Sequence, residues 1–187
     1  VEGTGAMVRA AKDWTSGLVQ GNEYGRYADN ASRCKDLLDQ FYGPHDQGVC
    51  DFANFVQVGQ ETLPAYEMLK PYLTYVHVKD ALFADGSVVP PGKGDGHVKE
   101  ILSDLIAGGY KGFLSLEPHL TDFMGLAALE QDPQNRGSAL DGQSAWTLAP
   151  ASLKDILRDI PQAQAALRHD HPTGGRGGVG WPSPGPR

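Results

Sequence analysis

Several short apolar runs in this sequence end in side chains that could do chemistry. The run YLTYV leads into His77, Lys79 and Asp80, and two further runs lead into Asp51 and Glu117. Burying a charge is costly unless the charge is paired or bound to a metal. Carboxylate and imidazole groups together suit a divalent ion such as Mn²⁺, Mg²⁺, Co²⁺ or Zn²⁺. The residue types therefore predict one divalent metal site; the alternative is that each strand has simply reached solvent.

Strands and helices must alternate along the chain for these residues to meet. Short β-rich apolar runs predict strands, and apolar residues at helical spacing predict helices. The predicted strands cover residues 17–20, 48–52, 73–78 and 111–117. The predicted helices start near residue 30, Thr62, Val98 and Trp146, with Asp29 or Asn30 as the cap of the first and Thr62 as the cap of the second. This order predicts a parallel α/β sheet, with the polar residues at the carboxyl ends of its strands. Asn22 and Glu23 hold the corresponding place after the first strand.

The composition excludes several classes of function. The chain has 187 residues, with 16 Lys and Arg against 23 Asp and Glu, and a net charge of −7 that argues against nucleic acid as a partner. No run approaches the roughly 18 apolar residues of a membrane span, and the start VEGTGAMVRAAKDW lacks the features of a signal peptide. Cys34 and Cys50 have no metal-type spacing, which favours free thiols in a reducing, cytoplasmic compartment, although a single disulfide stays open.

Five segments together resemble the sugar phosphate isomerase/epimerase family, the xylose isomerase-like TIM barrels. They are NEYGRYADNASRC, CDFANFVQVGQE, YVHVKDAL, VVPPGKGDGHVKEIL and GYKGFLSLEPHL, and the match runs from about Gly17 to Ile160. The resemblance implies a (β/α)₈ TIM barrel of which only the last four β/α units, the C-terminal half, are present. It also implies a metal-dependent enzyme that moves a proton next to a sugar carbonyl through an enediolate. Asp51, His77 and Glu117 match three of the family's metal ligands, and Glu117 also matches a catalytic acid/base.

One residue departs from the family pattern. The stretch VQGNEYG has Gly21 where the family carries its fourth ligand, a Glu that is also the second acid/base carboxylate. An epimerase of this type uses two carboxylates on opposite faces of the sugar, one to remove a proton and one to return it. Glu23 lies ~6.6 Å further along an extended strand, so it would reach the site only if the backbone turns. We therefore expect the chemistry to be impaired in this chain.

The length of the chain is the second departure. A complete barrel of this kind needs ~250 residues, so we expect residues 17–168 to form a half barrel, after an N-terminal remnant or helix in residues 1–16. Residues 169–187 are rich in Gly and Pro, which predicts a disordered tail. A half barrel leaves two open strand edges, and these favour a homo-oligomer.

Five polar residues near the strand ends are predicted to bind a small sugar or sugar phosphate: Glu23, Asn54, Lys79, Asp80 and His119. Each has a plainer alternative. Lys79 and Asp80 could orient His77 or form a surface ion pair, and Asn54 could belong to a turn. The GKGDG stretch, residues 92–96, could cradle a phosphate through its backbone amides or could be a flexible loop before the next helix.

Three functions are compatible with these residues. The first is a divalent-metal-dependent sugar or sugar-phosphate isomerase or epimerase. The second is an inactive, truncated member of the same family. The third is a metal-dependent phosphoesterase like the endonuclease IV enzymes, which needs two or three ions and a basic groove, so the acidic balance counts against it.

Overall fold

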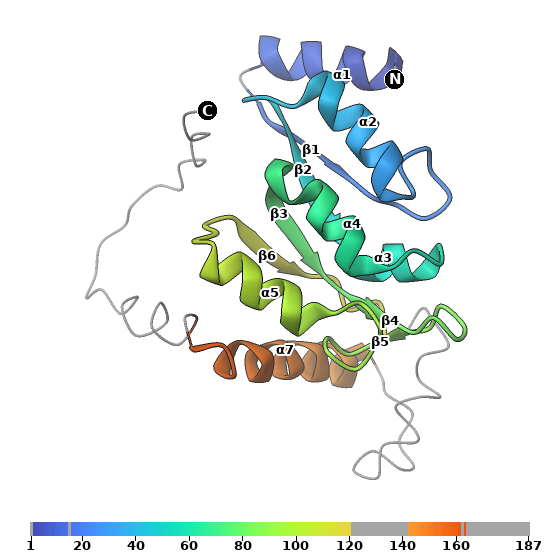
Figure 1. Cartoon of the computed structure of the whole chain (residues 1–187), viewed down its shortest axis with the longest axis vertical. Helices are drawn as coiled ribbons and strands as arrows, with labels where there is room; N and C mark the ends of the chain where they lie inside the picture. Colours follow the sequence, from blue (N-terminus) through green and yellow to red (C-terminus); the bar gives the residue numbers. More distant parts are fainter. Residues whose placement is uncertain (1, 15, 121–141, 162, 164–187) are drawn as a thin grey trace, which may run out of the picture.

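A four-stranded parallel sheet lies at the centre of the molecule (Figure 1). The computed structural model describes residues 2–14, 16–120, 142–161 and 163. The strands, in their spatial order, are β1 (Leu18–Gly21), β2 (Asp46–Asp51), β3 (Leu73–Val78) and β6 (Phe113–Leu116). All three neighbouring pairs are parallel, which confirms the sheet that the alternating pattern predicts.

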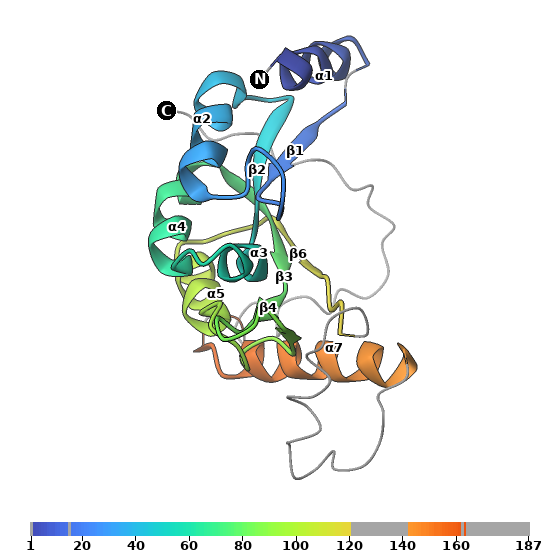
Figure 2. The same ribbon diagram turned by 90° about the vertical axis from the view of Figure 1, so that its right-hand side faces the viewer.

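Helices connect the strands, and three of them cover one face of the sheet. Figures 1 and 2 show α2, α4 and α5 side by side on that face. The helices are α1 (Glu2–Asp13), α2 (Ala31–Phe41), α3 (Phe52–Gln57), α4 (Thr62–Leu69), the 3-10 turn η1 (Lys70–Tyr72), α5 (Val98–Ala107) and α7 (Gly142–Arg158). In α5 the residues Val98, Ile101, Leu102 and Leu105 recur at helical spacing and are all buried, which holds this helix against the sheet.

The ends of three helices test the sequence predictions. Asn30 caps α2, because its side chain accepts a hydrogen bond from the Arg33 backbone N–H, and this prediction is confirmed. The predicted cap at Thr62 is wrong: Glu61 is the N-cap of α4, and Thr62 is a buried residue inside the helix. Helix α7 begins four residues before the predicted start, so Pro150 lies inside it.

Two short features were not predicted by the sequence patterns. Helix α3 has only six residues, too few to show a periodic pattern. An antiparallel pair of strands, β4 (Asp80–Ala81) and β5 (Val88–Val89), lies between the predicted strand at 73–78 and the predicted helix at Val98. Both features follow directly after a strand of the main sheet, and both help to position the site described below.

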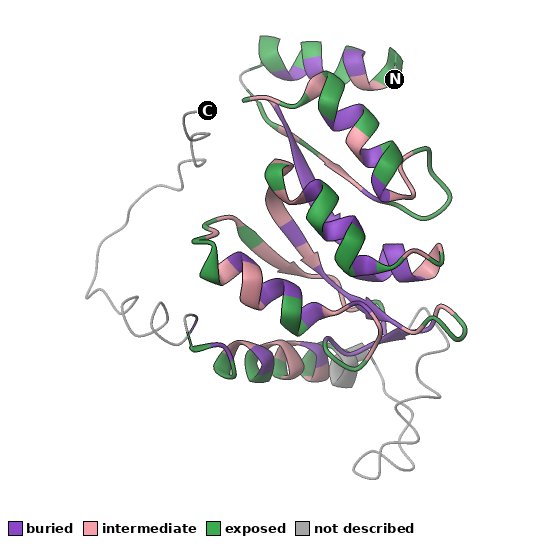
Figure 3. Ribbon diagram, in the orientation of Figure 1, coloured by how far each residue is buried: buried purple, intermediate pink, exposed green. Residues whose placement is uncertain are grey.

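The two faces of the main sheet have different neighbours. On the helix side, Cys50, Val76 and Val78 are buried in the main apolar core, and Figure 3 shows buried positions along the helices that pack there. On the opposite side, the Tyr75 and Phe113 rings lie 5.6 Å apart, and Phe113 is 47% exposed. Within the described residues, this second face is therefore only partly covered.

The remaining predictions about the chain are of three kinds. Cys34 and Cys50 are buried free thiols, which confirms that they are unpaired. None of the helices in the described ranges has the length and apolar character to cross a bilayer. The domain limits at residues 1–16 and 17–168 stay predictions, although α1 occupies most of the first range, and the predicted tail at 169–187 lies outside the described residues.

Candidate metal centre

Asp51, His77 and Glu117 come together at the carboxyl ends of three neighbouring strands. Each offers one ligand atom, and these atoms all lie within 4.8 Å of one another. Asp51 closes β2 and is in register with His77 on β3. Glu117 follows β6, and its backbone N–H still donates to the Val78 carbonyl at 3.2 Å. The parallel sheet therefore brings together the three residues that the sequence predicts as metal ligands.

Two asparagines fix the position of Asp51. The Asn54 backbone N–H donates to Asp51 Oδ1 at 3.0 Å, so Asp51 caps the short helix α3. The Asn22 side chain donates to the Asp51 carbonyl at 2.6 Å and accepts from the Asp51 N–H at 2.8 Å. Strand β1 ends at Gly21, so the Asn22 amide continues the ladder in place of backbone groups. These contacts hold Oδ1 on the helix and leave Oδ2 directed elsewhere.

The second oxygen of Asp51 lacks a proper hydrogen-bond partner. Asp51 is 2% exposed, and its Oδ2 makes no hydrogen bond of acceptable geometry, although Lys79 Nζ lies 2.9 Å away. The same ammonium is 3.4 Å from Glu117 Oε2. A buried, unsatisfied carboxylate oxygen beside an imidazole and a second carboxylate is a donor set that fits a divalent ion.

Burial and charge act against each other at this pair. Burial raises the pKa of Asp51 above its ordinary value, and the charge of Lys79 and the hydrogen bond from the Asn54 N–H oppose that rise. Burial on its own would lower the pKa of Lys79, but the charges of Asp51 and Glu117 outweigh it and leave that pKa raised. Lys79 therefore stays protonated at neutral pH and supplies positive charge to both carboxylates.

Glu117 has two imidazoles beside its carboxylate. His77 Nδ1 lies 3.1 Å from Glu117 Oε1, and His119 Nε2 lies 3.7 Å from Glu117 Oε2. His119 has a φ of 42°, a left-handed conformation that residues with a side chain seldom adopt. Glu117 is half-buried, so it can both bind an ion and exchange a proton with a ligand in the adjoining pocket.

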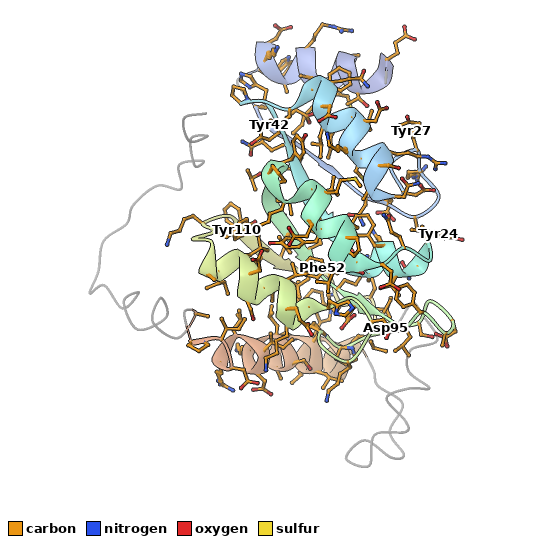
Figure 4. The ribbon with its side chains drawn as sticks, in the orientation of Figure 1. Tyr24, Tyr27, Tyr42, Phe52, Asp95 and Tyr110 are labelled. Atoms are coloured by element: carbon orange, nitrogen blue, oxygen red, sulfur yellow. The ribbon has the colours of Figure 1, made fainter. Side chains whose placement is uncertain are left out.

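An open pocket of about 490 Å³ adjoins this cluster. It is lined by Glu23, Tyr24, Asn54, Gln57, Lys79, Asp85, Gly86, Glu117 and His119. Four of the five predicted substrate-binding residues are in that set, and their binding of a sugar stays a prediction. Sequence reasoning missed Tyr24, which Figure 4 labels, as well as Gln57, Asp85 and Gly86. Gln57 ends α3, so the sequence could have indicated it only if that helix had been predicted. Tyr24 could have been indicated only by its position next to Glu23.

Asp80, the fifth predicted substrate contact, has a different set of partners. It is completely buried. Its Oδ1 accepts hydrogen bonds from the backbone N–H groups of Ala81 at 3.0 Å and Gly96 at 2.8 Å. Its Oδ2 accepts from those of Gly92 at 2.8 Å and Gly94 at 2.9 Å. Burial raises the pKa of Asp80, and these four donors oppose the rise. We therefore assign Asp80 to holding the loop rather than to contact with a sugar.

The same contacts explain the glycines of the GKGDG stretch. A Cβ on Gly94 would lie 2.5 Å from the Asp80 carboxylate and one on Gly96 would lie 2.7 Å from it, and Gly92 has a φ of 81°. Asp95, labelled in Figure 4, ties the loop further by accepting the Phe83 N–H at 2.7 Å. The amides suggested as a phosphate cradle are thus occupied by a carboxylate of the chain itself.

Gly21 has little room for a larger side chain. A Cβ built there would lie 2.8 Å from Val49 Cγ1, because the two residues are in register on neighbouring strands. Beyond Gly21 the chain leaves the sheet, and the Glu23 backbone N–H bonds to the Ala28 carbonyl at 3.1 Å. This turn brings Glu23 to the pocket that Glu117 also lines.

No protein-family model matches the sequence, and a search of curated proteins finds no match. Solved structures do match. A D-tagatose 3-epimerase-like protein is 16% identical, with a TM-score of 0.58, over 84% of this chain and 52% of its own. An L-ribulose 3-epimerase is 15% identical, with a TM-score of 0.57, over 90% and 57%. A xylose isomerase-like TIM barrel protein from Mycobacterium smegmatis, in complex with magnesium, is 17% identical, with a TM-score of 0.51, over 79% and 48%.

At these identities the likeness shows the fold alone. The chain spans about half the length of these solved structures, which agrees with a parallel sheet of four strands and one partly covered face. Its assignment to the C-terminal half of the barrel stays a prediction. The resemblance in the sequence is confirmed at the level of fold: this chain is a partial α/β barrel that is similar in structure to xylose isomerase-like TIM barrels.

Proposed function

We propose that this chain carries the metal centre of a divalent-metal-dependent isomerase or epimerase of sugars. The observation that supports the proposal is the cluster of Asp51, His77 and Glu117, whose ligand atoms lie within 4.8 Å of one another beside an open pocket. Two of the similar solved structures are described as epimerases or epimerase-like, and a third was solved with magnesium. Mn²⁺, Mg²⁺, Co²⁺ and Zn²⁺ all accept this ligand set.

The residues divide the chemistry between them. Asp51, His77 and Glu117 would hold the ion, which when bound polarises the carbonyl of a sugar. Glu117 removes or returns the proton on the neighbouring carbon, because its carboxylate is half-buried and reaches the pocket. Glu23 lines the same pocket and supplies the second carboxylate that inversion at this carbon needs. Lys79 holds Asp51 and Glu117 together through its two contacts.

Calorimetric titration of Mn²⁺ into the purified chain tests the metal centre. We expect one ion per chain in the wild type and no measurable binding in His77→Ala. His45→Ala is the matched control, because His45 precedes the opposite end of β2, where it contacts the Ser16 carbonyl at 2.9 Å. Equal binding in wild type and His77→Ala would show that the ligand assignment is wrong.

Proton transfer is tested separately from metal binding. A ketohexose incubated with the chain in D₂O should take up deuterium at the carbon next to its carbonyl, as measured by NMR. Glu117→Gln should abolish this uptake. Uptake that is unchanged in Glu117→Gln would remove Glu117 from the mechanism.

One observation favours a second candidate, a domain that keeps the fold without turnover. The Lys79 ammonium already lies beside Asp51 and Glu117, and Gly21 replaces the family's fourth ligand. Failure of the wild type to bind Mn²⁺ would favour this candidate. The phosphoesterase alternative has weaker support, because the described residues hold one three-ligand group rather than sites for two or three ions.

The expected partners and location follow from the same proposal. The substrate is a small molecule, and strands β1 and β6 form the two edges of the described sheet, where a second copy of the chain could pair. The two free cysteines agree with a cytoplasmic location. Both statements are predictions that sedimentation of the purified chain and fluorescent tagging in cells can check.

A further inference from the structure

Backbone N–H groups of the loop after β3 hold the carboxylate of Asp80 in the way that such groups hold a bound anion. Three amides of the loop, those of Gly92, Gly94 and Gly96, donate to this carboxylate at 2.8 to 2.9 Å. Since all the bonds are accepted by the carboxylate, the ionised form fits them without a proton. Backbone N–H groups that converge on one anion in this way resemble an anion-binding nest, although here they come from alternate residues. Here the nest is filled from within the chain.

The position of this nest matters for phosphorylated ligands. In TIM barrels a phosphate frequently binds to the loops that follow the last two strands of the barrel. On the predicted assignment of this chain to the C-terminal half of a barrel, these two strands are β3 and β6, and the nest lies in the loop after β3. Because Asp80 is covalently part of the chain and completely buried, a ligand phosphate cannot displace it from these amides without refolding the loop.

The charge of the pocket disfavours a phosphate as well. Glu23, Asp85 and Glu117 all line it. Lys79 lines it too, but its ammonium is 2.9 Å from Asp51 Oδ2 and 3.4 Å from Glu117 Oε2. In the metal-free chain a sugar phosphate would therefore bring close to two negative charges into a pocket whose lysine is already paired.

We propose that the pocket accepts an unphosphorylated sugar and discriminates against the corresponding sugar phosphate. This inference rests on the proposed function and specifies its substrate class. The hydroxyl groups of a neutral sugar can bond to carboxylates and amides such as those of Glu23, Asn54 and Gln57. The same carboxylates repel a phosphate ester.

Paired ligands test the proposal on the wild-type chain. D-fructose and D-fructose 6-phosphate are titrated calorimetrically, with and without Mn²⁺, at constant ionic strength. We expect at least tenfold tighter binding of the free sugar. Tighter or equal binding of the phosphate ester would overturn this inference and leave the isomerase or epimerase proposal standing. If neither ligand binds, the proposed function fails, and the inference fails with it.

Charge-removing variants identify the cause of the discrimination. Asp85→Asn keeps an oxygen that can accept the Ser87 N–H, now at 2.9 Å, and removes one negative charge from the pocket. It should bind the phosphate ester several-fold more tightly than wild type does, so the ratio of free-sugar affinity to ester affinity should fall. Glu67→Gln is the matched control, because Glu67 is an exposed residue of α4 and does not line the pocket. Equal effects of both variants on the ester would overturn the assignment to pocket charge.

A third measurement needs no sugar. Inorganic phosphate should raise the Tm of the wild type no more than sodium chloride does at the same ionic strength, because the nest is filled. A phosphate-specific rise in Tm that Lys93→Ala abolishes would place a free phosphate site in this loop and overturn the proposal.

Discussion

Two buried aspartates lie at the carboxyl ends of neighbouring strands and have different hydrogen-bond donors. Asp51 closes β2 and Asp80 follows β3, and they are 2% and 0% exposed. Asp80 accepts four backbone N–H groups, two on each oxygen. Asp51 accepts the Asn54 N–H on Oδ1, and its Oδ2 has the badly angled Lys79 ammonium as its neighbour.

This difference separates a residue that builds the site from one that can act in it. A carboxylate whose lone pairs are all taken by fixed backbone donors has nothing left to offer a ligand, and its value is the geometry of the loop. A buried carboxylate oxygen that no N–H group occupies can still pair with a cation, as Asp51 Oδ2 does with the Lys79 ammonium. Residue type and burial are the same in both cases, so the donors around each carboxylate decide its role.

The largest effect on stability is expected for Asp80→Ala. The change leaves four backbone N–H groups without their acceptor in a buried place, which should lower the free energy of unfolding by roughly 4 kcal/mol. Asp51→Ala should cost less, because it leaves fewer donors unpaired. Urea denaturation of both variants measures the difference. Formate, which can replace the lost carboxylate, should recover part of the loss in Asp80→Ala and none in Asp51→Ala.

One outcome would contradict this distinction between Asp80 and Asp51. If Asp51→Ala is the more destabilised protein, the backbone donors around Asp80 are not what holds the loop.

The next effect concerns the cation beside Asp51. Lys79→Met removes the partner of a buried carboxylate and should destabilise the metal-free chain by about 3 kcal/mol. Mn²⁺ should reverse most of this loss, because binding at 100 times the Kd adds about 2.7 kcal/mol to the free energy of unfolding. Denaturation with and without Mn²⁺ measures both numbers. Lys93→Met is the control for loss of charge, since Lys93 is exposed in the glycine loop.

Lys79→Met also shows whether the Lys79 ammonium competes with Mn²⁺ for the carboxylates of Asp51 and Glu117. If Mn²⁺ stabilises wild type and Lys79→Met equally, the ammonium does not compete with the ion for Asp51 and Glu117. A larger gain in the variant would show that wild-type metal affinity is reduced by the lysine.

How far the sequence predicts the site depends on how local each contact is. Asp51, His77 and Glu117 meet because they end neighbouring parallel strands, and alternation of strands and helices is visible in the sequence. The role of Asp80 depends on amides 12 to 16 residues further along the chain, at Gly92 to Gly96. A pattern of strands gives no information on where such a loop folds back.

The fold shows the same limit. Helix α2 was predicted with its cap, because the hydrogen bond that the Arg33 N–H donates to the Asn30 side chain is local. The cap at Thr62 was predicted from residue preference alone, and in the structure that residue is buried in the helix. The place of Glu23 in the pocket depends on the turn after Gly21, and residue spacing could state only that such a turn was needed.

A smaller effect on stability is expected where the fourth ligand that the sequence resemblance implies is introduced. Gly21→Glu adds a carboxylate near Asp51 but places its Cβ 2.8 Å from Val49 Cγ1, so it should cost about 1 to 2 kcal/mol by overpacking. Val49→Ala in the same chain should relieve the contact, which a double-mutant cycle detects as a favourable coupling. The double variant should also bind Mn²⁺ more tightly than Val49→Ala alone. No gain in affinity would show that position 21 does not point to the cluster.

The smallest effect is a change in pH dependence. Burial raises the pKa of Asp51. Between the ordinary pKa of an aspartate and this raised pKa, the Asp51 carboxyl therefore holds a proton in the folded chain that it has lost in the unfolded chain. The contribution of Asp51 is therefore most favourable below the ordinary pKa of an aspartate, and it is lost as the pH rises through the folded value. A difference of one unit between the pKa of Asp51 in the folded chain and in the unfolded chain changes the free energy of unfolding by about 1.4 kcal/mol. In Asp51→Asn this loss disappears, so without metal the variant should gain on wild type as the pH rises from about 4 to 7. Urea denaturation across that range, in a metal chelator, measures the difference in free energy of unfolding. A difference that changes in the opposite direction would mean that the Lys79 ammonium outweighs burial, so that Asp51 is already completed by a cation in the metal-free chain.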